Sequence, residues 1–162
     1  MRFDKNTSPL YPQRANISDS IADVDVKKYL IVPIFFRRQI EKVLEAHMPH
    51  QGFGFFFGTS ENNYRIIKKI WPVKIASGWQ NQIKGEDLRQ AKLLAEESNL
   101  QLLGCFHNGP LVQFLDGDNL KILTSDSFSN VRINMKEGKT HFWNSGLIEG
   151  PNLFSSPEVV IL

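Results

Sequence analysis

Apolar residues recur at helical spacing in two segments of the chain. Between Pro33 and Pro49 they repeat every three or four positions, which predicts an amphipathic helix that begins after the first proline and ends at the second. The segment 85–99 has acidic residues in its first turn and an apolar stripe behind them, which predicts a second helix. The residues that recur at this spacing in the first helix are Phe36, Ile40, Val43, Leu44 and His47.

Other segments have the pattern of strands. Residues 52–60 form a short apolar run bounded by glycine, which predicts a strand buried on both faces, and residues 64–75 follow as its hairpin partner. Residues 100–106 predict a strand that returns after the second helix. Residues 131–146 predict a further hairpin around a Lys-Glu-Gly-Lys turn, and residues 157–162 predict a last edge strand.

This order of elements predicts an α/β (α+β) fold, in which a mixed, largely antiparallel sheet is flanked by two main helices. A chain of 162 residues with 41% hydrophobic residues suits one domain. Residues 1–27 lack a helical or strand period. We therefore expect a loosely ordered N-terminal arm, followed by a single domain over residues 28–162.

Charge and cysteine content narrow the classes of partner and compartment. The 19 basic and 17 acidic residues give a net charge of +2 without a long block of one sign, so no nucleic-acid partner is indicated. No apolar run is long enough for a membrane span, and the polar start lacks the apolar core of a signal peptide. The single cysteine, Cys105, excludes an internal disulfide and a Cys-rich zinc framework. We expect a soluble cytoplasmic protein.

Three stretches place glycines and polar residues at the ends of predicted elements: MPHQGFGFFFG (48–58), IKGEDLRQAKLLAEESNLQLLGCFHNGP (83–110) and FLDGDNL (114–120). In this order they resemble the JAB/MPN (Mov34-like) family, whose active members are zinc isopeptidases with a JAMM motif. The stretch 48–58 is similar to the family's Pro-x-Glu-x-x-Gly-Leu-Leu-x-Gly strand. The stretch 83–110 resembles its helix and Gly-x-x-His-Ser-His-Pro motif, and the stretch 114–120 lies where Ser-x-x-Asp follows. The resemblance implies a cytidine-deaminase-like JAB/MPN architecture over roughly residues 30–145.

The resemblance also implies a chemistry. In active members two histidines and an aspartate hold zinc and leave a position open for water, which the metal makes more acidic. A glutamate takes the proton from that water, and a serine donates a hydrogen bond to the developing oxyanion.

Most of these residues are replaced here. The glutamate position falls on Gln51, whose amide cannot remove a proton at neutral pH. His107 matches the first histidine, whereas the second position is Gly109 and the serine between them is Asn108. The catalytic centre that the resemblance implies is therefore degenerate.

The stretch 114–120 leaves the last two positions open. With a spacer about two residues shorter than usual, the aspartate position falls on Asp118 and the serine position on Leu115; with the usual spacer they fall on Leu120 and Gly117. Asp116 is a further candidate. At most a half site of His107 with one aspartate survives. Alternatively, Asp116 and Asp118 are turn residues whose carboxylates accept backbone hydrogen bonds.

The first functional hypothesis is a catalytically inactive JAB/MPN-like domain, a pseudoenzyme that acts as a protein-binding or scaffold module without a cofactor. Its expected partner is another protein, such as a ubiquitin-like tail or a second JAB/MPN domain, and a homodimer fits this hypothesis. Neither nucleic acid nor a membrane is expected. An extended peptide could also add to an exposed strand edge near Gln51.

Two alternatives are enzymes. A zinc-dependent isopeptidase or metallopeptidase would complete its site with His107, one of the two aspartates, and a third ligand such as His50 or Glu61. A hydrolase could instead use Cys105, because Cys105 and His107 point to the same face of a strand. Against both stands a structural reading in which His107 and Gln51 make ordinary hydrogen bonds and Cys105 is a buried free thiol.

Overall fold

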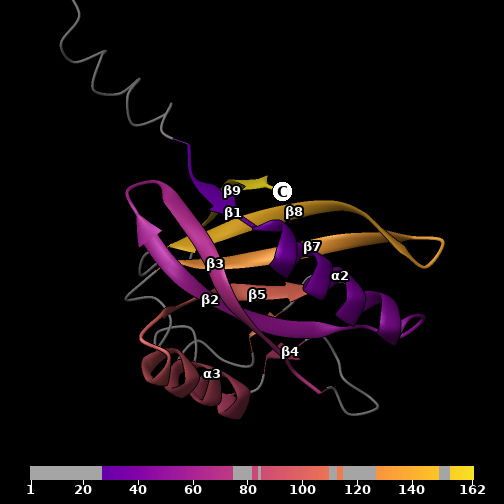
Figure 1. Cartoon of the computed structure of the whole chain (residues 1–162), viewed down its shortest axis with the longest axis horizontal. Helices are drawn as coiled ribbons and strands as arrows, with labels where there is room; N and C mark the ends of the chain where they lie inside the picture. The colour runs from indigo at the N-terminus through magenta and orange to yellow at the C-terminus, as the bar shows by residue number, and fades with distance from the viewer. Residues whose placement is uncertain (1–26, 75–81, 84, 110–112, 115–126, 150–153) are drawn as a thin grey trace, which may run out of the picture.

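The strands of this protein form a closed barrel (Figure 1). The structure, a computed structural model, describes residues 27–74, 82–83, 85–109, 113–114, 127–149 and 154–162. In order around the barrel the seven strands are β1 (Tyr29–Ile31), β3 (Tyr64–Pro72), β2 (Phe53–Glu61), β5 (Gln101–His107), β7 (Phe128–Lys136), β8 (Lys139–Glu149) and β9 (Phe154–Ile161). Outside the barrel, β4 (Gln82–Ile83) and β6 (Gln113–Phe114) pair with each other.

Most of the predicted elements are present. The two predicted helices are α2 (Ile34–His47) and α3 (Gly85–Glu97). The predicted hairpins are β2 with β3 and β7 with β8, both antiparallel, and β5 follows α3. Six consecutive residues of β2, from Phe53 to Gly58, are buried, which confirms the strand buried on both faces.

The predicted fold class is wrong, because the sheet closes on itself. β1 pairs in parallel with β3 on one side and with β9 on the other, so the C-terminal strand that was expected at an edge has two neighbours. A strand of three residues is too short to show a period of two, and nothing local in a sequence indicates which distant strands it joins. The protein therefore does not have the cytidine-deaminase-like architecture, a sheet flanked by helices, that the resemblance implied.

α2 packs against the barrel beside the short strand β1. It follows β1 directly and contacts both β3 and β8. Its Glu45 carboxylate accepts a hydrogen bond from the Thr140 backbone N–H of β8, at 3.3 Å. Its buried side chains Ile40 and Leu44 join inward-facing residues of the strands in one core. That core contains Leu30, Val32, Phe56, Ile67, Leu103, Phe106, Val131 and Ile133.

α3 covers the opposite face of β2 and β5. Its buried residues Leu88, Ala91 and Ala95 belong to a second core, which includes Phe55 and Cys105. Phe55 and Phe56 are neighbours on β2 and belong to different cores, since successive side chains of a strand point to opposite faces. Figure 1 shows α3 on the far side of these strands from α2.

A charged side chain lies inside the barrel. The Arg65 guanidinium of β3 donates from Nη2 to the carbonyl oxygens of Leu103, at 2.7 Å, and Ser127, at 2.8 Å. Its Nη1 donates to Ser129 Oγ and lies 3.5 Å from Glu158 Oε2. The strand register of β2 with β5 skips Leu103, so this carbonyl lies at a bulge. Arg65 therefore links β3, β5, β7 and β9 from the inside.

Glu158 of β9 completes this interior network. Its Oε1 accepts hydrogen bonds from the hydroxyl groups of Ser129 and Ser145, both at 2.7 Å. The Arg65 and Glu158 side chains are 6% and 0% exposed. A buried ion pair is tolerated only where such hydrogen bonds offset the loss of hydration, and here they do so on both partners.

Neither described helix is long and apolar enough to cross a membrane. The single cysteine is free and buried.

Candidate functional site

Four of the sequence-predicted site residues, Gln51, His107, Asn108 and Gly109, gather where β2 begins and β5 ends. Phe53 pairs with His107 across the two strands. One residue further out, the Gly52 N–H donates to Asn108 Oδ1 at 2.7 Å. The Gln51 side chain lies against Gly109. The other predicted positions, Leu115, Asp116, Gly117, Asp118 and Leu120, lie outside the described residues.

Gly109 is needed for this arrangement. A Cβ atom at this position would lie 2.5 Å from Gln51 Cδ and 2.7 Å from both polar atoms of its amide. Any side chain here would displace Gln51. The Gln51 Oε1 atom is buried without a hydrogen-bond partner among the described residues.

His107 is fully buried and makes a hydrogen bond with Asn130, a residue that the sequence pattern did not indicate. Its Nε2 lies 2.9 Å from Asn130 Oδ1 of β7. Because this oxygen can only accept, Nε2 carries the ring hydrogen and Nδ1 keeps its lone pair. Nδ1 is buried with no hydrogen-bond partner among the described residues. In this arrangement His107 makes a hydrogen bond at the end of β5, as in the structural interpretation of this residue.

Burial also fixes the charge of His107. Loss of hydration lowers the pKa of His107 to about 4; the Asn130 bond and the Gly109 backbone oppose this shift, and the Arg132 charge adds to it. The ring is therefore neutral at pH 7. A neutral imidazole is the form that binds a metal ion, through a nitrogen that carries no hydrogen.

Cys105 is not an activated nucleophile. It shares the acceptor of His107, since its Sγ donates to Asn130 Oδ1 at 3.7 Å. Burial raises the pKa of the Cys105 thiol far above its usual range, and a hydrogen bond with the Val131 backbone offsets this only in part. The thiolate is the reactive form, so this thiol is inert at neutral pH.

The described residues do not by themselves make a metal site. None of them forms a group of three or more His, Cys, Asp and Glu side chains that could hold a metal ion. Glu61 ends β2 beside the hairpin turn, whereas His107 pairs with Phe53 at the start of that strand. Eight residues of strand separate the two ends, roughly 26 Å. Glu61 therefore cannot join His107, and the zinc hypothesis stays a prediction that needs ligands from outside the described residues.

Stability is expected to fall between pH 6.5 and pH 4 through His107. The unfolded chain protonates this residue near its ordinary pKa of 6.5, and the folded protein only near 4. In this window the unfolded state binds more protons, so the contribution is fully present above pH 6.5 and is lost as the pH falls through 4. The loss reaches up to about 3 kcal/mol.

Urea unfolding of the wild type and of His107→Gln at about pH 7 and about pH 4.5 measures this contribution. The surface carboxylates affect both proteins equally, so the variant should lose less stability over this interval. An equal loss in both would show that His107 does not carry the pH dependence.

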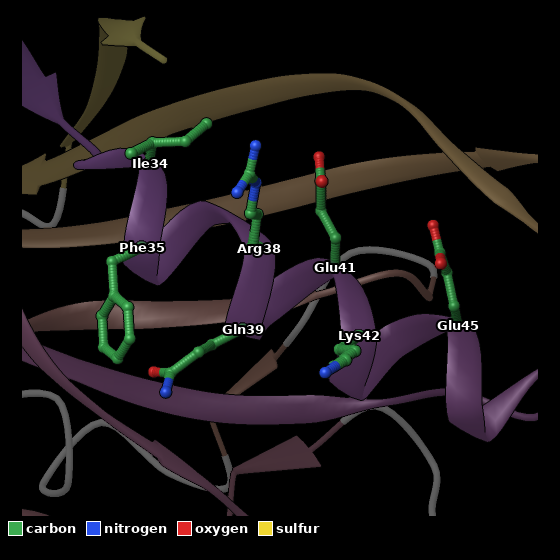
Figure 2. Close-up of a pocket in the computed structure, with 7 residues that line it drawn as sticks. All are labelled: Ile34, Phe35, Arg38, Gln39, Glu41, Lys42 and Glu45. Carbon is green, nitrogen blue, oxygen red and sulfur yellow. The ribbon is translucent and has the colours of Figure 1, made fainter.

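A second candidate surface is the outer side of α2 (Figure 2). Ile34 and Phe35 are adjacent large apolar side chains that are 55% and 61% exposed. They border an open hollow of about 640 Å³ along the helix. The rest of its lining is polar or charged: Arg38, Gln39, Glu41, Lys42 and Glu45. Figure 2 shows these side chains projecting from α2 along its length.

The sequence contained a signal for this surface that periodicity did not use. The run Ile34-Phe35-Phe36 places three large apolar residues in succession at the start of a helix. Successive residues lie about 100° apart, so one buried stripe cannot cover all three. Phe36 packs against the core, and the other two remain exposed.

Two solution structures of bacterial proteins have a similar fold. A protein from Desulfitobacterium hafniense matches over 82% of this chain and 92% of its own, with a TM-score of 0.59 and 15% sequence identity. A protein from Salinibacter ruber matches over 80% of this chain and 89% of its own, with a TM-score of 0.54 and 17% identity. At such identities the similarity shows the fold alone. No family model and no curated protein matches the chain.

The assignment to the JAB/MPN (Mov34-like) family is therefore wrong. The two structures named above are small proteins with a seven-stranded barrel, and no family model supports the assignment. The resemblance depended on glycines, a proline and one histidine at strand ends. Glycine and proline occur there in many folds because turns and close backbone approaches require them.

Proposed function

We propose that this chain is a non-catalytic protein-binding module that assembles through the outer face of α2, with a second copy of the chain as its partner. The exposed pair Ile34 and Phe35 carries the proposal. Large exposed apolar side chains beside charged ones are typical of surfaces that bind other proteins. The inert Cys105 supports a non-catalytic role, and a free thiol fits the cytoplasm.

The charges along α2 favour a second copy over an unrelated partner. Basic residues at 38 and 42 alternate with acidic residues at 41 and 45. When two such helices run antiparallel across a two-fold axis, residues at equal distances from the axis face each other. With the axis between Glu41 and Lys42, Arg38 of one copy faces Glu45 of the other, and Lys42 faces Glu41. These four charges on each helix then meet the opposite sign, while Arg37 keeps its partner Glu41 within its own helix.

The same register also brings the apolar residues together. Phe35 then lies level with Met48 of the second copy, and Ile34 lies level with Pro49, which follow the end of α2. Met48 is partly exposed and Pro49 is exposed. Each apolar end of the helix is thus covered, and the charges between them fix the register.

The expected complex is weak and sensitive to salt. One helix face is smaller than the roughly 800 Å² per partner of a standard interface. Exposed charge pairs add little affinity, but they select the partner and the orientation. We therefore expect a reversible dimer that dissociates as ionic strength rises.

Charge-reversed variants test the proposal. An acidic variant carries Arg38→Glu and Lys42→Glu, and a basic variant carries Glu41→Lys and Glu45→Lys. Each alone should be monomeric because like charges meet across the axis, whereas an equimolar mixture should form a heterodimer. Sedimentation equilibrium at low ionic strength measures both.

Arg89→Glu is the matched control, because Arg89 is an exposed arginine on α3. It should associate as the wild type does. Because Glu41 and Glu45 also have partners within the chain, circular dichroism should first show that each variant is folded. The proposal fails if both charge-reversed variants associate like the wild type, or if mixing them produces no association.

A further inference from the structure

An apolar patch lies on the outside of the barrel, away from α2 and α3. It consists of two rows across three adjacent strands. Tyr64, Tyr29 and Val159 face each other in one row, and Ile66, Ile31 and Ile161 in the next. The two tyrosine rings stack with centroids 5.1 Å apart. We refer to these six residues as the outer patch.

Strand alternation shows that the outer patch faces away from the core. Leu30 and Arg65, which lie between patch residues on their strands, are 0% and 5% exposed. Val160 packs against the inner core. By contrast Tyr64, Val159 and Ile161 are 46%, 42% and 40% exposed. Among the described residues, neither helix packs over the outer patch, since α2 joins the core inside the barrel and α3 covers β2 and β5.

We infer that the outer patch is the docking site for the chain's own residues 17–26. The described chain begins at Lys27, two residues before Tyr29 of the outer patch. A segment that leads into β1 at this point has only to reverse its direction to lie across the three strands of the outer patch. These strands span roughly 10 Å at about 4.8 Å per strand. An extended chain covers that distance in about three residues.

The sequence of this segment fits the outer patch. It reads ISDSIADVDV, with apolar residues at Ile17, Ile21, Val24 and Val26 and with three aspartates and no basic residue. The outer patch is bordered by Lys28, which contacts Glu149 at 3.8 Å, and by the exposed Lys68 of β3. The apolar residues match the apolar rows, and the aspartates match the basic border.

Two arguments favour this segment over a second copy. A two-fold pairing of outer patches would bring Lys28 and Lys68 of one copy near the same lysines of the other, which costs energy. The segment is also covalently attached, which gives it an effective concentration of the order of millimolar. A second copy would have to bind more tightly than that to compete.

Thiol accessibility in the full chain tests this inference. Val159→Cys places a reporter in the outer patch, and the native Cys105 is buried and unreactive, so the reporter dominates the signal. With the native segment, reaction with a thiol reagent should be at least tenfold slower than in the same protein carrying Ile17→Ser, Ile21→Ser and Val24→Ser. Leu93→Cys, an exposed site on α3, should react equally fast in both backgrounds.

The inference is overturned if the Val159→Cys reporter reacts at the same rate with either segment. Protection that grows with protein concentration would also overturn it, because it would assign the outer patch to a second copy. A rise in Cys105 labelling in the segment variant would reveal unfolding. In that case Val24→Ser alone, which changes one apolar contact, must still speed the reporter reaction for the inference to hold.

Discussion

Glu158→Ala is expected to destabilise the folded protein by about 3–5 kcal/mol, because it removes the carboxylate that pairs with the buried Arg65 charge. The two serine hydroxyl groups that donate to Glu158 also lose their acceptor. The network connects five strands of the barrel, so its loss weakens the closure of the sheet as well as one local contact. Urea unfolding followed by tryptophan fluorescence measures the change.

A double-mutant cycle separates the ion pair from the general cost of truncation. Arg65→Ala should cost a similar amount, and the double variant should cost less than the sum of the two by about 0.5–3 kcal/mol. Lys28→Ala breaks the partly exposed pair with Glu149 and should cost under about 1 kcal/mol. A Glu158→Ala protein as stable as Lys28→Ala would contradict the role of the interior network.

Phe56→Ala is expected to cost about 3–5 kcal/mol, through lost apolar burial and the cavity that remains. Phe56 is fully buried and belongs to the core that joins α2 to the barrel interior. Phe35→Ala is the matched control, because the same change on the exposed face of α2 should stay within about 0.5 kcal/mol. Chemical unfolding of both variants tests the assignment of the two faces, which equal losses would contradict.

The elements of the fold were predictable because their signals are local. The prolines at 33 and 49 bracket α2, and the alternation around residues 136–139 indicates the β7–β8 hairpin. The closure of the barrel was not predictable. It depends on three residues, Tyr29 to Ile31, which pair in parallel with strands more than 30 residues and more than 120 residues away in the sequence. No periodic pattern encodes such pairings.

The candidate site was predictable only in part. Gln51 and His107 end adjacent strands, and the expected hairpin and returning strand already brought those ends near each other. Asn130, which fixes the His107 ring, comes from a strand that pairs in parallel with β5, and the sequence gives no sign of that pairing. The burial of Arg65 and Glu158 was not predicted either, because charged residues on strands ordinarily face solvent.

The resemblance to a zinc-dependent family gave no indication of the α2 surface. It favoured the ends of β2 and β5, where His107 is neutral and held in place. The two most exposed large apolar residues among the described ones, Ile34 and Phe35, lie elsewhere, on α2. Their exposure could have been predicted from the run Ile34-Phe35-Phe36, which is too wide for the single buried face of an amphipathic helix.

Sedimentation equilibrium of the wild type and Phe35→Ser tests the proposed assembly most directly. We predict a reversible monomer–dimer equilibrium for the wild type, with a dissociation constant that rises with ionic strength. Phe35→Ser should raise that constant roughly tenfold or more, because it removes an apolar side chain worth about 1.5–3 kcal/mol when buried. A wild type that stays monomeric at all concentrations, or a dimer that Phe35→Ser leaves unchanged, would contradict assembly through α2.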